Sequence, residues 1–102
     1  MTQFNDREKA FEAKFAHDQE MQFKADARRN RLVGLWAAGV LGHSDPEAYA
    51  KQVIAADFEE AGDEDVFRKL AGDLGSRASE SEIREMMVAK MVEAKAQLME
   101  ET

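Results

Sequence analysis

Hydrophobic residues recur every three to four positions over most of the chain, which is the spacing that places them on one face of an α-helix. The clearest example is the apolar stripe formed by Ile83, Met87, Met91, Ala94 and Leu98. No segment shows the convincing alternation of apolar and polar residues that is typical of a β-strand. The pattern therefore predicts an all-α protein.

Helix ends are marked by turn and capping residues. Asp45 precedes Pro46, a pair typical of a helix start. Gly75 is well placed to end a helix, and Ser79 and Glu82 have the spacing of a capping box. Together these signals predict helices over residues 4–41, 46–60, 64–74 and 80–100, with Asp63 as a cap of the third. Four helices with short loops predict a small four-helix bundle.

The expected core follows from the same pattern. Leu32, Trp36 and Val40 are spaced four apart in the most apolar stretch and are expected to form one face. Gly34 and Gly39 lie in that stretch and are expected to allow close contact between helices. The inward-facing residues expected in the next two helices are Tyr49, Val53, Ile54, Val66, Phe67, Leu70, Ala71 and Leu74, with Phe58 near the end of the first of them.

The first predicted helix is too long for the bundle. At about 1.5 Å per residue, residues 4–41 would span roughly 57 Å, whereas the last helix would reach only about 30 Å. Close to half of the first helix would therefore have no partner within the bundle. Because an isolated helix of under about 15 residues is marginal in water, we expect residues 1 to about 18 to be frayed or disordered in the free protein.

This leading segment carries a phenylalanine stripe. Phe4, Phe11 and Phe15 fall within roughly 40° of one another on a helix and do not simply extend the core face of Leu32 and Trp36. One interpretation is a recognition helix that binds in an external groove. The alternative is an amphipathic helix that folds back on the bundle or pairs two copies of the protein.

Composition and charge limit which partners and which cellular location we expect for this protein. The net charge is −7, and it is uneven: residues 1–31 hold seven basic and six acidic residues, so the excess of acid lies in residues 32–102. Such an acidic body repels nucleic acid and anionic lipid. There is no cysteine, no apolar run of membrane-spanning length and no signal-peptide core, so we expect a soluble, cytoplasmic protein.

A basic cluster, Arg28, Arg29 and Arg31, interrupts the acidic chain. Nucleic-acid binding is disfavoured because no aromatic residues interleave with the arginines. The simplest interpretation is a solvated helix face beside Trp36 that pairs with acidic residues of the second and last helices. Two functional alternatives are docking to an acidic protein partner and contact with the phosphates of a nucleotide.

Candidate catalytic and metal sites are sparse. His17 and His43 lie near opposite ends of one long predicted helix and are expected to be exposed or capping residues. The acidic run at residues 63–65 lacks the spacing and turn glycine of a calcium loop. We therefore expect no enzyme activity, no metal and no cofactor. The methionines at positions 86, 87, 91 and 99 are expected to form an adaptable core, with a binding surface as the alternative.

Several stretches of the chain, taken together, resemble the ζ subunit family, the small inhibitor proteins of the α-proteobacterial F-type ATP synthase. The stretches are residues 4–15, AHD at 16–18, FKA at 23–25, ARRNRL at 27–32, GLWAA at 34–38, DF at 57–58 and GDEDVFRKL at 62–70. The resemblance covers most of the chain. It implies a four-helix protein whose N-terminal segment reversibly inhibits ATP hydrolysis by inserting as a helix at a catalytic interface between the α and β subunits.

The resemblance also implies where the partner binds. It divides the chain into an inhibitory segment, residues 1–19, and an acidic bundle, residues 20–102, which stays outside and orients the insert. The partner-binding residues it implies are Phe4, Arg7, Glu8, Phe11, Glu12, Lys14 and Phe15, with a secondary contact through Arg28, Arg29 and Arg31. The implied partners are the α and β subunits and the γ subunit of the rotor, which would hold the protein peripheral to the membrane.

Two other functions remain open at this stage. A general helical adaptor would dock its N-terminal helix on another protein, and a nucleotide-responsive regulator would use the arginine cluster.

Overall fold

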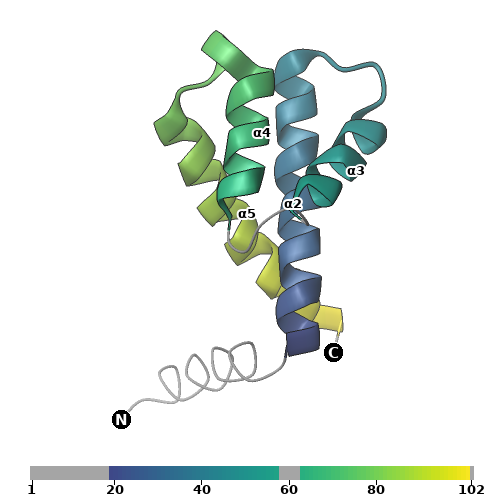
Figure 1. The fold of residues 1–102 in the computed structure, drawn as a ribbon. Helices are drawn as coiled ribbons and strands as arrows, with labels where there is room; N and C mark the ends of the chain where they lie inside the picture. Colours follow the sequence, from purple (N-terminus) through teal and green to yellow (C-terminus); the bar gives the residue numbers. More distant parts are fainter. Residues whose placement is uncertain (1–18, 58–62, 102) are drawn as a thin grey trace.

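The computed structural model describes residues 19–57 and 63–101. In these residues the chain forms the helices α2 (Gln19–Leu41), α3 (Pro46–Ala56), α4 (Glu64–Leu74) and α5 (Glu80–Glu101), with a short 3-10 turn, η1 (Gly75–Arg77), before α5 (Figure 1). Strands are absent from this part of the chain. The predicted all-α bundle is confirmed, whereas the expectations for residues 1–18 and for Phe58 lie outside the described residues.

Helix α2 is the centre of the bundle. It contacts α3, α4 and α5, most extensively α3 and α5, and α5 crosses it so that the C-terminal end of α5 lies near the start of α2 (Figure 1). The face of α2 that enters the core differs from the prediction. Val33 and Ala37 are fully buried, whereas Leu32 and Trp36 are only half-buried and Val40 is 37 % exposed.

Small side chains explain this rotation of the buried face. A Cβ atom at Gly34 would lie 2.9 Å from the Cα atom of Ala50 in α3, closer than real Cβ contacts allow. The glycine therefore permits the backbones of α2 and α3 to approach closely, and the larger Leu32 and Trp36 are displaced to the sides. The expected close contact is confirmed for Gly34 and is wrong for Gly39, which has no atom within 4 Å of such a Cβ.

In the part of the chain that the structure describes, the core consists of two apolar clusters. The larger one joins all four helices and contains Val33, Ala37, Tyr49, Val53, Val66, Leu70, Leu74, Ile83 and Met87. The smaller one packs Met21 and Ala25 of α2 against Leu98 of α5, with Met91 beside it. Most of the predicted inward residues are thus buried, although Ile54 and Ala71 are only partly so. Met86, Met87 and Met91 pack on these clusters, as expected of a core role.

The helix ends follow the predicted capping chemistry with two exceptions. The Asp45 carboxylate accepts a hydrogen bond of 3.2 Å from the Ala48 amide, and Gly75 ends α4 with φ of 56°. Ser79 and Glu82 form the reciprocal capping box, since each amide donates to the other side chain, at 3.3 and 3.1 Å.

The exceptions are α3 and Asp63. Helix α3 ends at Ala56, four residues earlier than predicted, and Asp57 follows as its C-cap. Asp63 precedes α4 but makes no side-chain capping bond. Both carboxylates instead bind side chains of α2, an interaction between distant segments that local capping signals do not reveal.

The close contact at Gly34 gives a first test. We expect Gly34→Ala to destabilise the fold by about 1–3 kcal/mol, because overpacking against the α3 backbone outweighs the better helix propensity of alanine. Gly39→Ala is the matched control in the same helix and should stabilise the fold by about 0.5–1 kcal/mol. Urea unfolding followed by circular dichroism measures both, and equal effects would contradict the close approach of α2 and α3.

Candidate protein-docking site

Arg29 is the most deeply buried charged residue of the basic cluster. Its side chain is 2 % exposed, and its guanidinium donates to the Asp63 carboxylate at 2.9 Å and to the side-chain oxygen of Asn30 at 2.6 Å. The Asn30 amide in turn donates to the Asp57 carboxylate at 3.0 Å. These four residues, which we call the Arg29 network, therefore tie α2 to both residues that flank positions 58–62.

The Arg29 network lies between the two apolar clusters. On α2 it follows Ala25 of the smaller cluster and precedes Val33 of the larger one. A buried guanidinium is tolerated only when its hydrogen-bonding capacity and charge are matched, and here Asp63 and Asn30 supply the match. The interpretation of the cluster as a solvated helix face is wrong for Arg29, because its partners draw it into the interior.

Arg28 and Arg31 are disposed differently, on the outside of the bundle. The Arg28 guanidinium pairs with both carboxylate oxygens of Glu101 in α5, one of them at 3.0 Å, and the Arg31 guanidinium pairs with Glu47 of α3 at 2.6 Å. The hydrogen bond from Arg28 lowers the pKa of Glu101. The predicted pairing of these arginines with the second and last helices is confirmed, while their contact with a partner stays a prediction.

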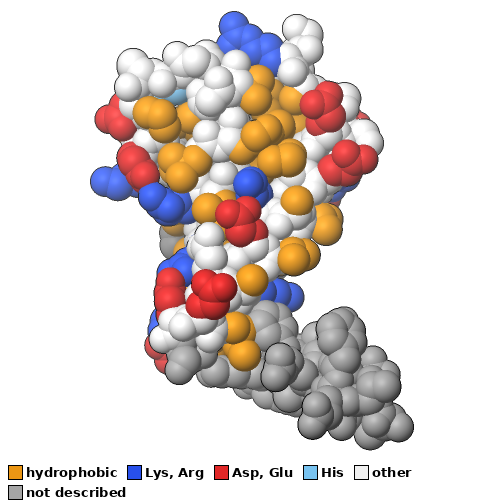
Figure 2. All heavy atoms as spheres, turned by 180° about the vertical axis from the view of Figure 1, so that it is seen from behind, with side chains coloured by type: hydrophobic (Ala, Val, Ile, Leu, Met, Phe, Trp, Pro, Cys, Tyr) orange, Lys and Arg blue, Asp and Glu red, His pale blue; other side chains and the backbone are white. Residues whose placement is uncertain are grey.

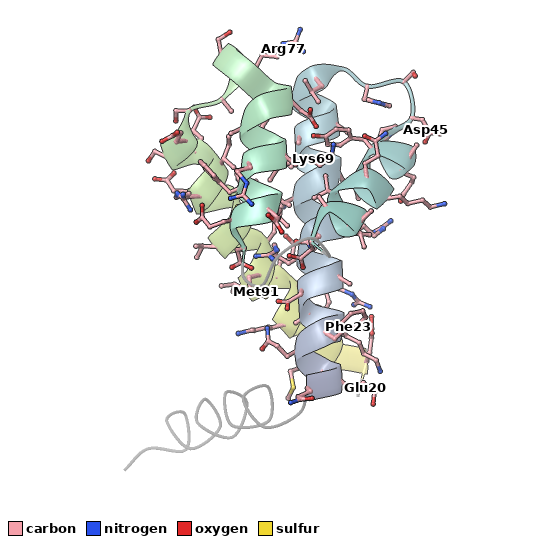
Figure 3. All side chains as sticks on the ribbon, in the orientation of Figure 1. Glu20, Phe23, Asp45, Lys69, Arg77 and Met91 are labelled. Atoms are coloured by element: carbon pink, nitrogen blue, oxygen red, sulfur yellow. The ribbon has the colours of Figure 1, made fainter. Side chains whose placement is uncertain are left out.

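A groove of about 570 Å³ opens beside these two arginines. Its apolar lining comes from three helices, and its basic lining comes from one face of α2. The residues that carry this character are the apolar Met21, Phe23, Ile54 and Leu98 and the basic Lys24, Arg28 and Arg31. Figure 3 shows Phe23 near the start of α2, at the same end as Glu20. We call this feature the α2 groove.

The α2 groove was not predicted from the sequence. Phe23 is 60 % exposed although it is a large aromatic residue. A signal for it was present, because Phe23 stands in a charged stretch and its helical angle matches neither the leading phenylalanine stripe nor the core face. No sequence pattern indicated that Ile54 and Leu98 line a groove, since both were predicted to be ordinary core residues.

Besides Glu101, two aspartates of the described bundle, Asp57 and Asp73, have pKa values that are shifted in opposite directions. Burial raises the pKa of Asp57, and this effect exceeds the lowering by the Asn30 hydrogen bond and the Arg29 charge. Burial also raises the pKa of Asp73, but hydrogen bonds from Lys69 and Tyr49, with the Lys69 charge, outweigh it and leave a lowered pKa. Tyr49 donates to Asp73 at 2.8 Å, and the pKa of Tyr49 is raised by burial and by this bond.

The remaining candidates from the sequence fall into two groups. Phe4, Arg7, Glu8, Phe11, Glu12, Lys14, Phe15 and His17 lie outside the described residues. His43 has a capping role, because its Nδ1 accepts a 3.0 Å hydrogen bond from the Asp45 amide. Over residues 19–57 and 63–101, no group of three acidic or histidine side chains is arranged to hold a metal ion.

The fold and this site define a small helical protein whose described residues form a groove lined by apolar and basic side chains. Among the described helices, none combines the length and apolar character needed to cross a membrane.

A family model for the ATPase inhibitor subunit zeta matches residues 1–97. The chain therefore belongs to the ATPase inhibitor subunit zeta family, and the resemblance seen in the sequence is confirmed. Membership of this family supports, in general terms, inhibition of the ATP synthase and a regulatory role.

Solved structures agree on the fold. One of three matching chains, a protein whose structure was determined by NMR in solution, is 57 % identical with a TM-score of 0.74. The match covers 80 % of this chain and 99 % of that one. No curated protein matches the chain.

The Arg29 network gives a second test. We expect Arg29→Ala to destabilise the fold by about 2 kcal/mol, because it removes a buried group whose partners then lack a donor. Arg31→Ala, which breaks an exposed pair, should change stability by less than about 1 kcal/mol. Thermal and urea unfolding compare the two variants, and equal losses would show that burial of Arg29 adds nothing.

The two shifted carboxyl groups predict opposite dependences of stability on pH. Because the pKa of Asp57 is higher in the folded chain, its ionisation disfavours folding as the pH rises above about 4. Because the pKa of Asp73 is lower in the folded chain, its carboxylate adds stability above about pH 4, which is lost as the pH falls through the folded pKa.

Relative to the unmodified protein, the free energy of unfolding of Asp57→Asn should therefore increase as the pH rises from about 3 to 6, whereas that of Asp73→Asn should decrease. Urea unfolding at intervals over this range measures both differences. If the stability differences of the two variants changed in the same direction with pH, the assigned pKa shifts would be contradicted.

Proposed function

We propose that the protein is a reversible inhibitor of ATP hydrolysis by the F-type ATP synthase, and that it inserts residues 1–19 as a helix at a catalytic interface between the α and β subunits. The observation that carries this proposal is the family match, which begins at residue 1 and so includes the leading segment together with the bundle.

The proposed division of labour separates residues 1–19 from residues 20–102. It is supported by the uneven charge of the chain, because residues 1–31 hold seven basic and six acidic residues whereas the excess of acid lies in residues 32–102. The bundle then stays outside the interface and orients the insert.

Within the leading segment, the proposed anchors are Phe4, Phe11 and Phe15, which share one helical face. Aromatic side chains at such spacing are typical of a helix that binds in an apolar groove. The charged residues between them, Arg7, Glu8, Glu12 and Lys14, would meet a surface of mixed charge and fix the register of the helix.

The mechanism follows from the rotary cycle of the synthase. Each catalytic interface must open and close in turn, so a helix wedged in one interface arrests all of them. Such an inhibitor must bind one state of the interface much more tightly than the others, because only a difference in affinity shifts a conformational equilibrium. When a segment becomes ordered on binding, the entropy that it loses offsets part of the interaction free energy. The weaker net affinity keeps inhibition reversible.

The proposed partners are the α and β subunits, together with the γ subunit if the insert reaches the rotor. Binding to the catalytic head would place the protein in the cytoplasm, peripheral to the membrane. Arg28 and Arg31 are proposed for a secondary contact, because Arg31 forms an exposed ion pair with Glu47 and the ion pair of Arg28 with Glu101 lies at the surface.

Deletion of residues 1–18 tests the proposal. We expect the full chain to suppress ATP hydrolysis by the isolated catalytic head of a cognate synthase. The shortened chain should lose this effect, because the aromatic anchors are gone, while its circular dichroism and urea midpoint still report a folded bundle. Equal suppression by both chains would assign the blocking role to the bundle, and suppression by neither would contradict the inhibitor function.

A further inference from the structure

The α2 groove begins where the leading segment ends. Met21 and Phe23 of α2 line it just after residue 19, and Leu98 lines it near the end of α5. Figure 3 shows Phe23 near the start of α2. If the bound helix continues from the leading segment into α2, Phe23 lies only about 12 Å along the axis from Phe15, at about 1.5 Å per residue. A partner surface at the mouth of the interface would therefore face this groove.

The charge of the groove differs from that of the chain. Among the described residues, its lining includes Lys24, Arg28 and Arg31 and one carboxylate, Glu101, in a protein of net charge −7. Glu20 and Glu47 pair with two of these cations from outside the lining. Even with both counted, the charges of these described residues cancel, whereas the chain as a whole is acidic.

Two of these cations, Lys24 and Arg31, can exchange partners readily, whereas Arg28 is held more closely by Glu101 and Gln97. The side chains of the Lys24–Glu20 pair are 53 % and 76 % exposed, and those of the Arg31–Glu47 pair are 47 % and 57 % exposed. Exposed pairs of this kind contribute about 0–1 kcal/mol. A carboxylate of a partner that arrives with its own apolar surface can therefore replace the internal one at little cost.

We propose that the α2 groove is a second docking site of the inhibitor, and that it takes an acidic, amphipathic helix on the surface of the synthase head, beside the interface that residues 1–19 enter. Phe23 is the central aromatic anchor, surrounded by Met21, Ile54 and Leu98. Lys24, Arg28 and Arg31 bind the acidic side chains of that helix. This inference rests on the proposed function, because it takes its partner and its position from the inserted segment.

A second apolar area competes with this assignment. Figure 2, which views the molecule from behind Figure 1, shows hydrophobic side chains at the surface. On α5, Val88 and Val92 are 67 % and 65 % exposed. The neighbouring hollow is smaller, about 220 Å³, and its lining includes the Arg29 and Asp63 pair of the structural network. Val88 lies in the middle of α5 and lacks the direct continuity with the leading segment, so it provides a control of similar exposure.

The test uses the full chain and ATP hydrolysis by the catalytic head. We expect Phe23→Ala to raise the concentration for half-inhibition at least about tenfold, the scale of a central aromatic anchor, while Val88→Ala changes it less than twofold. For the charge, Arg31→Glu should weaken inhibition, whereas Arg84→Glu should not. Arg84 is a matched control because it forms an exposed pair with Glu64 outside the groove.

Circular dichroism and urea midpoints confirm that all four variants are folded. If the deletion of residues 1–18 abolishes inhibition but Phe23→Ala and Arg31→Glu inhibit normally, the groove proposal is wrong and the inhibitor proposal stands. If Val88→Ala weakens inhibition as much as Phe23→Ala, docking is not confined to the α2 groove and the assignment fails. If the deletion has no effect on inhibition, the blocking role belongs to the bundle and the proposed insertion of residues 1–19 fails, and if neither chain inhibits, the inhibitor function itself fails.

Discussion

Burial of the Arg29 guanidinium is the constraint on which the rest of the bundle depends. A cation that is 2 % exposed must find its partners inside the protein, and these partners come from residues flanking positions 58–62. Asp63, which binds Arg29 directly, immediately precedes α4. Asp57, which binds Asn30, is the C-cap of α3. One polar network therefore fixes where α3 stops and where α4 begins relative to α2. It also separates the two apolar clusters that hold α2 against the other helices.

The same short segment of α2 serves both structure and surface. Successive residues on a helix are turned by about 100°, so Arg29 points into the bundle while Arg28 and Arg31 reach Glu101 and Glu47 on the outside. The buried arginine is satisfied and gives the bundle its geometry. The two outer arginines form surface ion pairs of small net contribution, and Arg28 also donates to Gln97. This difference turns one basic cluster into an anchor for the fold and a rim for the α2 groove.

A bundle arranged in this way suits an inhibitor that acts by binding. The described core packs α2 against α3, α4 and α5, and we propose that the leading segment and the α2 groove bind the partner. Membership of the ATPase inhibitor subunit zeta family gives that partner its general identity. A segment that enters an interface and a rigid bundle that docks beside it would act as two linked contacts, and linkage makes the second contact effectively intramolecular.

The sequence by itself determined the helices, their caps and the family. The capping box of Ser79 and Glu82, the stop at Gly75 and the stripe of α5 depend on residues within a few positions of one another, and all three were predicted. Tertiary structure alone decided which arginine is buried, where α3 ends and how the α2 groove is lined. Those outcomes depend on residues far apart in the chain: Arg29 and Asp63 are 34 positions apart, and Arg28 and Glu101 are 73 apart. Helical periodicity shows which residues share one face of a helix, but only packing against the other helices decides which face is buried.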